Sequence, residues 1–282
     1  MKHYLSLIKF SHTIFALPFA CIGFFLASSN KTINWSVFIY VILCMIFARS
    51  AAMAFNRYID REIDKENKRT SLTREIPNGT ISAKNALIFV VINCFLFIVT
   101  TYFINSICFK LSPLALLIIL GYSYTKKFTA LCHLVLGLGL ALSPIGAYLA
   151  INETFHILPI LFSISVLLWV AGFDIIYSLQ DQEFDKQQKL HSIPVLLGKK
   201  KALKISQFLH IIVIGILLFI GYNFSFKEFY WIGFTIFSSL LFYQHTLVSE
   251  NDLSKVNLAF FTTNGVASVI FGFFVIYDLL IN

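Results

Sequence analysis

The chain carries Asn56-Arg57-Tyr58-Ile59-Asp60-Arg61-Glu62-Ile63-Asp64 at the end of a long apolar run. Asn56, Asp60 and Asp64 are spaced four residues apart, so on a helix they form one stripe. A second apolar run ends in a similar stripe, which contains Asp174, Tyr177, Asp181 and Asp185. If the two stripes face each other, their oxygen atoms form the kind of cage that divalent cations such as Mg2+ prefer.

Both acidic stripes lie at the C-terminal ends of apolar segments. Surface acids that cap helices are the ordinary alternative, but the helix dipole favours acids at the N-terminus and disfavours them at the C-terminus. A carboxylate at membrane depth costs about 2.5–3.5 kcal/mol on insertion scales, and such residues usually serve a function. The position and the repeated helical spacing therefore predict a functional site at these two helix ends.

The composition excludes an ordinary soluble domain. Hydrophobic residues make up 58% of the chain, charged residues only 13%, and the mean hydropathy is +0.79. Several apolar runs approach or exceed the roughly 20 residues that a helix needs to cross a bilayer. The sequence lacks the alternating segments of about ten residues that are typical of membrane β-barrels. We therefore expect an all-α integral membrane bundle.

Nine apolar segments are expected to span the membrane within a single domain that covers residues 1–282. They lie at about 13–29, 36–56, 83–104, 111–124, 131–151, 157–178, 202–222, 229–248 and 257–281. Two polar loops, at about 57–83 and 179–203, follow the segments that carry the acidic stripes, and Ser82 is expected to cap the third segment. A cleaved signal peptide is the alternative for the first segment, but further spans follow at once.

The basic residues predict the orientation. Of the bases in the loops, only Lys31, Lys110 and Lys227 fall on the side opposite the N-terminus. The positive-inside rule then places the N-terminus and both acidic loops in the cytoplasm, and we expect a bacterial-type inner (plasma) membrane. The net charge of +8 has the same explanation, so we expect membrane lipid and no nucleic acid as a partner.

Three segments resemble the UbiA superfamily of intramembrane prenyltransferases. One is similar to its first aspartate-rich motif and consists of Asn56, Asp60 and Asp64, followed by Lys68-Arg69-Thr70 and Arg74. The second stripe, Asp174 to Asp185, is similar to its second motif. The segment between the fourth and fifth spans resembles its tyrosine–lysine segment and reads Tyr122-Ser123-Tyr124-Thr125-Lys126-Lys127. The motifs come in the order of that superfamily, and the resemblance covers essentially the whole chain.

The resemblance implies a nine-helix enzyme that joins a polyprenyl diphosphate to an aromatic ring with Mg2+. The implied metal ligands are Asn56, Asp60, Asp64, Asp181 and Asp185. Arg57 departs from the pattern, because many members have aspartate after the asparagine. The chain is most similar to the branch of 4-hydroxybenzoate polyprenyltransferases, which includes futalosine-route menaquinone enzymes that prenylate a dihydroxynaphthoate. The sequence does not separate these two aromatic acids.

The chemistry of diphosphate release agrees with these residues. Metal ions held by the two stripes would neutralise the leaving diphosphate as Lewis acids. Nearby bases are placed to add charge-assisted hydrogen bonds, and they are Lys68, Arg69, Arg74 and Lys126. An ordinary basic patch on a cytoplasmic loop is their alternative explanation. The allylic cation needs a dry pocket, and three aromatic rings could shield it by cation–π contact: Tyr122, Tyr124 and Tyr177. Their alternative role is that of interface aromatics.

Arg49 is expected inside the membrane, two helical turns before Asn56 on the same stripe. An arginine at that depth should face an internal cavity and have a partner. One alternative is an ion pair with Asp174, the deepest acid of the second stripe. The other is that Arg49 binds the carboxylate of the aromatic acceptor, since a guanidinium matches a carboxylate bidentately. For His12, His133 and His191, structural hydrogen bonding is expected rather than catalysis.

Two other classes of membrane protein use intramembrane acids. An ion-coupled transporter usually places them near the membrane midplane, whereas most of the acids here lie at the helix ends. A CDP-alcohol phosphotransferase requires a glycine and an alanine–arginine pair between its aspartates, and neither stripe supplies them. A prenyltransferase therefore explains the residues best.

Overall fold

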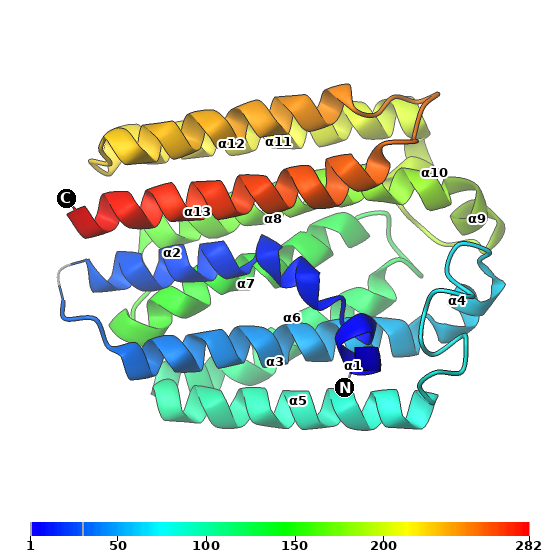
Figure 1. The fold of residues 1–282 in the computed structure, drawn as a ribbon, viewed down its shortest axis with the longest axis horizontal. Helices are drawn as coiled ribbons and strands as arrows, with labels where there is room; N and C mark the ends of the chain where they lie inside the picture. The colour runs from blue at the N-terminus through cyan, green and yellow to red at the C-terminus, as the bar shows by residue number, and fades with distance from the viewer. Residues whose placement is uncertain (1, 30, 282) are drawn as a thin grey trace.

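A computed structural model describes residues 2–29 and 31–281. The described residues contain helices and no strands, and nine long helices lie side by side in one bundle (Figure 1). They are α2 (Leu17–Ser28), α3 (Trp35–Ile59), α5 (Ala83–Ile104), α6 (Ser106–Thr125), α7 (Cys132–Asn152), α8 (Ile157–Ser178), α11 (Lys199–Asn223), α12 (Glu228–Thr246) and α13 (Asn264–Ile281). Seven of them are long and apolar enough to cross a membrane by themselves, and α2 and α12 run alongside these. The predicted all-α bundle is confirmed, and its nine long helices agree with the predicted count.

Side-chain caps set where several helices begin. Ser82 accepts a hydrogen bond from the backbone N–H of Asn85, as predicted for the start of α5. Asn105 caps α6 in the same way through the N–H of Cys108 at 2.8 Å, and it also donates to the carbonyl of Leu149 on α7. The fourth helix therefore begins at Ser106, five residues before the predicted start, because this cap lies ahead of the apolar run.

Small residues allow α7 to pack closely against its two neighbours. A Cβ atom added at Gly137 would overlap the backbone carbonyl of Leu167 on α8. A Cβ atom added at Gly23 of α2 would likewise overlap the carbonyl of Pro144 on α7. Close approach of helix backbones through glycine is typical of membrane bundles, where packing replaces the hydrophobic effect as the driving force.

The apolar core is concentrated in the second half of the chain. Its largest cluster is built around Phe162 and Trp169 of α8, Phe237 of α12 and Phe271 of α13. The last predicted helix is interrupted near its start, because η3 (Leu258–Thr263) is a π-helix that leads into α13. Such π segments are uncommon and often accompany an inserted polar side chain or a functional site.

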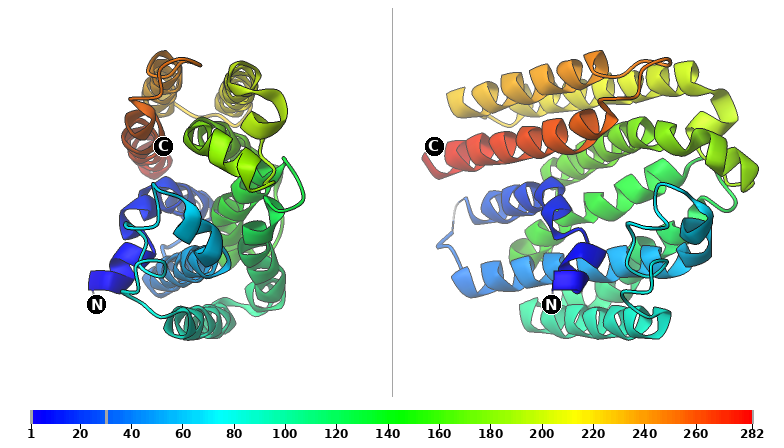
Figure 2. Two further views of the ribbon diagram at one scale, coloured as in Figure 1. Left: turned by 90° about the vertical axis from the view of Figure 1, so that its right-hand side faces the viewer. Right: turned by 45° about the vertical axis from the view of Figure 1, so that its right-hand side comes forward.

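Both polar loops lie at the same end of the bundle. The first contains α4 (Arg61–Glu66), and the second contains α9 (Gln182–Gln187) and α10 (Ile193–Leu197). Figures 1 and 2 show these short helices together at the end opposite the C-terminus. Two segments far apart in the sequence are therefore brought together where α3 and α8 end.

Candidate active site

Asp60 lies at the junction between α3 and α4 and is almost completely buried, with 1% of its surface exposed. One of its carboxylate oxygens, Oδ2, accepts hydrogen bonds from Nδ2 of Asn56 at 3.1 Å and from Nζ of Lys126 at 2.6 Å. Lys126 comes from the C-terminal end of α6, so this ion pair joins two helices. The other oxygen, Oδ1, is buried without a hydrogen-bond partner among the described residues.

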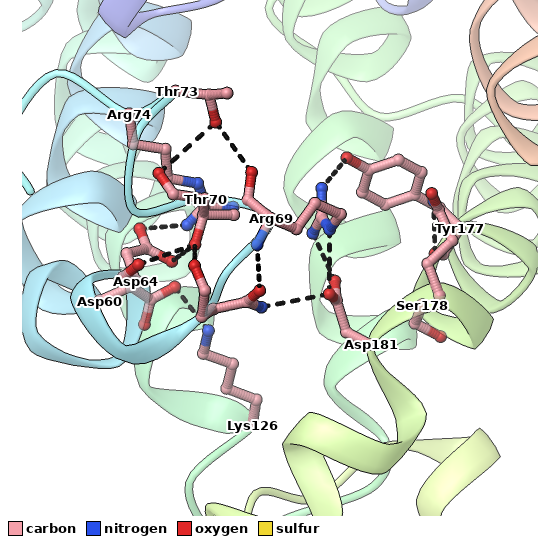
Figure 3. Close-up of polar contacts among 12 residues, drawn as sticks. Asp60, Asp64, Arg69, Thr70, Thr73, Arg74, Lys126, Tyr177, Ser178 and Asp181 are labelled. Carbon is pink, nitrogen blue, oxygen red and sulfur yellow. Dashed lines mark hydrogen bonds and ion pairs between the residues drawn. The ribbon is translucent and has the colours of Figure 1, made fainter. Parts of the chain in front are cut away.

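Asp64 lies one turn further on and is 4% exposed. Its carboxylate forms an ion pair with Arg74, which lies in the loop after α4 (Figure 3). The hydroxyl of Thr70 donates a hydrogen bond to the backbone carbonyl of Asp64 at 2.9 Å. These contacts fold the loop back over the end of α3, so the bases that follow the first stripe reach its acids.

Asp181 joins the two polar loops. Arg69 of the first loop donates to both of its carboxylate oxygens, with Nε 3.0 Å from Oδ1, and Asn67 donates to Oδ1 at 3.2 Å. Arg69 also donates to the hydroxyl of Tyr177 at 3.1 Å (Figure 3). Burial would lower the pKa of Arg69, but these hydrogen bonds to Asp181 and Tyr177 raise it, so the guanidinium stays charged.

Asp185 lies within electrostatic range of both stripes. The charged groups that act on its carboxyl include Asp181, Lys126 and Asp60. A second bridge between the loops lies nearby, where Nε2 of Gln188 donates to Glu66 at 2.7 Å. The two acidic stripes therefore face each other across one small region, as their spacing indicates.

Asp174 has a partner other than the predicted one. Its carboxylate accepts a hydrogen bond from Nδ1 of His133 at 2.7 Å, while Nε2 of His133 accepts from the backbone N–H of Ile193 at 3.3 Å. The proposed ion pair between Asp174 and Arg49 is therefore wrong. Side-chain packing from α7 decides the pairing, since His133 lies at the start of α7 beside α8. His133 has the structural hydrogen bonds expected of it.

An apolar cavity of about 330 Å3 lies between α3, α6 and α7, beside this acidic region. Arg49 and Tyr122 are among the few polar residues in its wall. Arg49 makes no ion pair or side-chain hydrogen bond among the described residues, and its Nε is buried without a partner. Tyr122 lies within electrostatic range of Arg49. Arg49 thus faces a cavity, as its depth in the membrane predicts.

The sequence and the helical bundle are matched by known proteins. The model of the UbiA prenyltransferase family matches residues 16–266. The chain belongs to the UbiA prenyltransferase family. It is therefore an integral membrane prenyltransferase, and the transporter and phosphotransferase alternatives no longer apply.

Individual relatives of this UbiA member agree in length and shape. A 4-hydroxybenzoate octaprenyltransferase of Aliivibrio salmonicida is 30% identical over 84% of this chain and 83% of its own. A protein of that name from Herminiimonas arsenicoxydans is 25% identical over 91% and 89%. The apo structure of a UbiA homolog from Aeropyrum pernix K1 has a TM-score of 0.85 and 29% identity, covering 95% of this chain and 98% of its own. A UbiA homolog from Archaeoglobus fulgidus, bound to DMAPP and Mg2+, has the same fold, with 20% identity, 98% coverage of each chain and a TM-score of 0.75.

The structure leaves some predicted site residues outside the cluster. Lys68 is exposed and makes no ion pair or hydrogen bond with the acids among the described residues. Tyr124 is also exposed, with its ring against Phe55. Tyr177 lies inside, between Arg69 and the ring of Phe260. The side chain of His12 lies outside the described residues, and the imidazole of His191 is exposed.

Several site residues have no obvious signal in the sequence. Asn67 binds Asp181, yet it belongs to a polar loop in which many residues could do so. Thr70 is part of the quoted motif, but the sequence did not indicate that it binds Asp64. Arg57, which replaces a possible metal ligand, is buried and lies within electrostatic range of Asp64 and of Glu75. Only the folded loop shows which of its polar groups turn inward.

The donor set fits a divalent cation that is held together with an anion. Carboxylate and amide oxygens are its preferred ligands, and the buried, unpartnered Oδ1 of Asp60 is an available one. Within the described ranges, no three carboxylate, imidazole or thiol side chains converge as a preformed metal cluster. The reason is that the best-placed acids are each turned toward a base: Asp60 toward Lys126, Asp64 toward Arg74 and Asp181 toward Arg69.

Proposed function

We propose that this prenyltransferase moves a polyprenyl group from polyprenyl diphosphate to a ring carbon of an aromatic carboxylic acid, with Mg2+ as cofactor and diphosphate as the second product. The acceptor is 4-hydroxybenzoate or a dihydroxynaphthoate, which places the reaction in ubiquinone or menaquinone biosynthesis. The relatives named 4-hydroxybenzoate octaprenyltransferase support an aromatic acid as the acceptor.

One observation carries the proposal: a charged cluster that suits a diphosphate adjoins an apolar cavity that suits an isoprenoid tail. The two are connected by helical spacing, because Ala52 and Tyr122 line the cavity while Asn56 and Lys126 lie one turn further along the same helices. Arg49 is the cationic group in the cavity wall, where an acceptor carboxylate would meet it.

The cation would be held by Asn56, Asp60, Asp64, Asp181 and Asp185. When bound, it supplies Lewis-acid neutralisation of the departing diphosphate. Arg69, Arg74 and Lys126 then turn from the carboxylates to the diphosphate oxygens, to which they donate charge-assisted hydrogen bonds. Until the substrate arrives, the ion pairs seen in the structure neutralise both the carboxylates and these three basic side chains.

The remaining residues act on the organic part of the reaction. The apolar wall of the cavity excludes water from the allylic cation, which water would otherwise capture. The electron-rich faces of Tyr122 and Tyr177 stabilise that cation. Tyr177 already makes a contact of this kind, because Cζ of Arg69 lies over its ring, 5.5 Å from the ring centre. We assign to Asp174, which His133 holds at 2.7 Å, the role of accepting the proton that the acceptor loses.

A direct assay tests the proposed reaction. The full-length protein in lipid nanodiscs is incubated with Mg2+, farnesyl diphosphate and one acceptor, either 4-hydroxybenzoate or a dihydroxynaphthoate. Mass spectrometry should show a C-prenylated acid with one of the two. Phenol, which lacks the carboxylate, is the matched control and should react far more slowly if Arg49 binds that group. The absence of a C-prenylated product with both acids would remove the proposed acceptor class.

We also propose that the acidic end of the bundle faces the cytoplasm of a bacterial-type cell, because the loop bases gather there. Single cysteines introduced at Leu72 and at Leu196, both exposed, should react with an impermeant maleimide only from the cytoplasmic side. A cysteine at Lys31 should react only from outside. These measurements use a variant that lacks the five native cysteines. Labelling of either polar loop from outside would contradict this orientation.

A further inference from the structure

A buried polar network lies away from the active site, where α8, α11, α12 and η3–α13 meet. Its members are Trp169, His210, Gln244, His245 and Asn264. All except His245 are almost completely buried. Polar groups in a membrane bundle are costly unless they are hydrogen-bonded, so each donor and acceptor in this network needs a partner.

The indole of Trp169 fixes the direction of every hydrogen bond in the network, because its Nε1–H can only donate. It donates to Oδ1 of Asn264 at 2.8 Å, so the amide nitrogen of Asn264 donates to Oε1 of Gln244, also at 2.8 Å. The amide nitrogen of Gln244 must therefore face Nδ1 of His210, again at 2.8 Å. It follows that Nδ1 of His210 is an acceptor.

The second histidine is fixed in turn. Nε2 of His210 lies 3.1 Å from the carbonyl oxygen of Trp169, so Nε2 carries the proton and the ring is neutral. Nε2 of His245 lies 2.8 Å from the same Nδ1 of His210, so it carries a proton and shares the single lone pair of that atom with the amide of Gln244. When the His245 ring is neutral, its remaining nitrogen, Nδ1, is a bare acceptor. This atom is buried without a hydrogen-bond partner among the described residues.

Close packing builds this arrangement into the fold. A Cβ atom added at Gly172 of α8 would overlap the imidazole of His210, so glycine is what lets the ring reach the carbonyl of Trp169. Asn264 ends the π-helix η3 and also donates to the carbonyls of Ala259 and Phe260. The unpaired nitrogen of His245 is therefore the single unsatisfied end of an otherwise closed network of described side chains.

A cavity of about 150 Å3 adjoins the unsatisfied end, between α11 and α12. His210 and His245 form part of its wall, together with Gln207 and apolar side chains such as Ile214 and Leu241. Ile211 and Phe242, also in the wall, are 57% and 60% exposed, so the cavity adjoins the lipid-facing surface at the edge of the bundle (Figure 1). Gln207 brings an exposed amide to this face, which is unusual for a position in a membrane span.

We propose that this cavity binds a membrane-soluble molecule that carries a hydroxyl group on a hydrocarbon body. Its O–H donates to Nδ1 of His245, the amide of Gln207 pairs with the hydroxyl oxygen, and the body lies along Ile211 and Phe242. Nδ1 is covered in the structure, so the half-buried ring of His245 tilts toward the cavity as the hydroxyl enters. An unpaired buried acceptor is unfavourable, and the incoming donor removes that cost.

The chemistry of the wall excludes other ligand classes. Among the described residues, no cationic side chain lines the cavity, so an anion has no partner there. One free imidazole lone pair is too few ligands for a transition metal, because the other histidine nitrogens are already committed. Two sources have the required chemistry, namely a prenylated phenol and a membrane lipid with a free hydroxyl.

Photolabelling of the full-length protein in nanodiscs tests this site. The probe is a phenol with a C15 isoprenoid tail that carries a diazirine, and the matched probe is its methyl ether, which cannot donate a hydrogen bond. Mass spectrometry should locate phenol adducts in residues 207–214 and 241–245, with at least about tenfold fewer adducts for the ether, the scale of one hydrogen bond to a buried group. Adducts in the 330 Å3 cavity are counted separately, so a failure here is independent of the proposed reaction.

Variants and competitors complete the test. His245→Phe should lower phenol labelling at this site to the level of the ether, and the network should persist because Gln244 still donates to His210. Tyr243→Phe, which removes a hydroxyl from the lipid face outside the cavity, should change nothing. Competition by the unlabelled phenol or by dioleoylglycerol, but not by trioleoylglycerol, identifies which source occupies the site. Equal labelling by both probes in the unchanged protein, or no competition by either hydroxyl compound, would overturn the proposal.

Discussion

Asp64→Asn should lower the rate of prenyl transfer by about 10²-fold or more, a loss of several kcal/mol of transition-state stabilisation. The change removes a negative charge that the cation needs and leaves Arg74 without its ion pair. Asp60→Asn, Asp181→Asn and Asp185→Asn should have effects of the same order, because each acid belongs to one of the two facing stripes. Single-turnover measurements at saturating substrate report the chemical step, and an excess of EDTA should abolish it.

Glu62→Gln is the matched control for these variants. Glu62 lies on α4 between Asp60 and Asp64, but its side chain is 75% exposed and its ion pair is with Arg61. It should retain nearly full activity. Thermal unfolding in the same detergent separates a loss of catalysis from a loss of fold, since Arg74 is largely buried. Full activity of Asp64→Asn, or full activity in excess EDTA, would refute metal catalysis by these acids.

Arg49→Lys should raise the KM for the aromatic acid by about tenfold or more, with a much smaller change in the KM for the prenyl diphosphate. Lysine keeps the charge but loses the planar pair of donors that matches a carboxylate. Hydrogen bonds to charged groups contribute roughly 1.5–3 kcal/mol, which sets the size of the effect. Because the structure pairs Asp174 with His133, no carboxylate among the described residues already occupies this guanidinium.

The control for Arg49 is Arg61→Lys. Arg61 lies in the acidic end of the bundle, where its guanidinium donates a hydrogen bond to the carbonyl of Tyr58 and lies over the ring of Tyr58. It should leave both KM values unchanged. Circular dichroism and gel filtration verify that Arg49→Lys still folds. An unchanged KM for the acid in a folded Arg49→Lys protein would remove Arg49 from the acceptor site.

The nine membrane helices could be predicted from the sequence because lipid leaves the backbone few choices. An apolar run of sufficient length must form a helix, since its N–H and C=O groups find no other partners in the membrane. The facing of the two stripes could be predicted for a similar reason, because acids at two matching helix ends repel each other unless a common cation holds them together. The depth of Arg49 likewise predicted that it lines a cavity, and the structure places it there.

The tertiary structure decided which groups pair. Asp174 binds His133, and Arg69 reaches Asp181 of the other loop, because loop folding and helix packing set distances that no sequence spacing contains. The network of Trp169, His210 and His245 also escaped prediction, since its members come from three helices and each is an ordinary residue by itself. Periodicity along one helix specifies a face, whereas a hydrogen bond between helices depends on how closely they pack, and at Gly172 that closeness depends on a missing side chain.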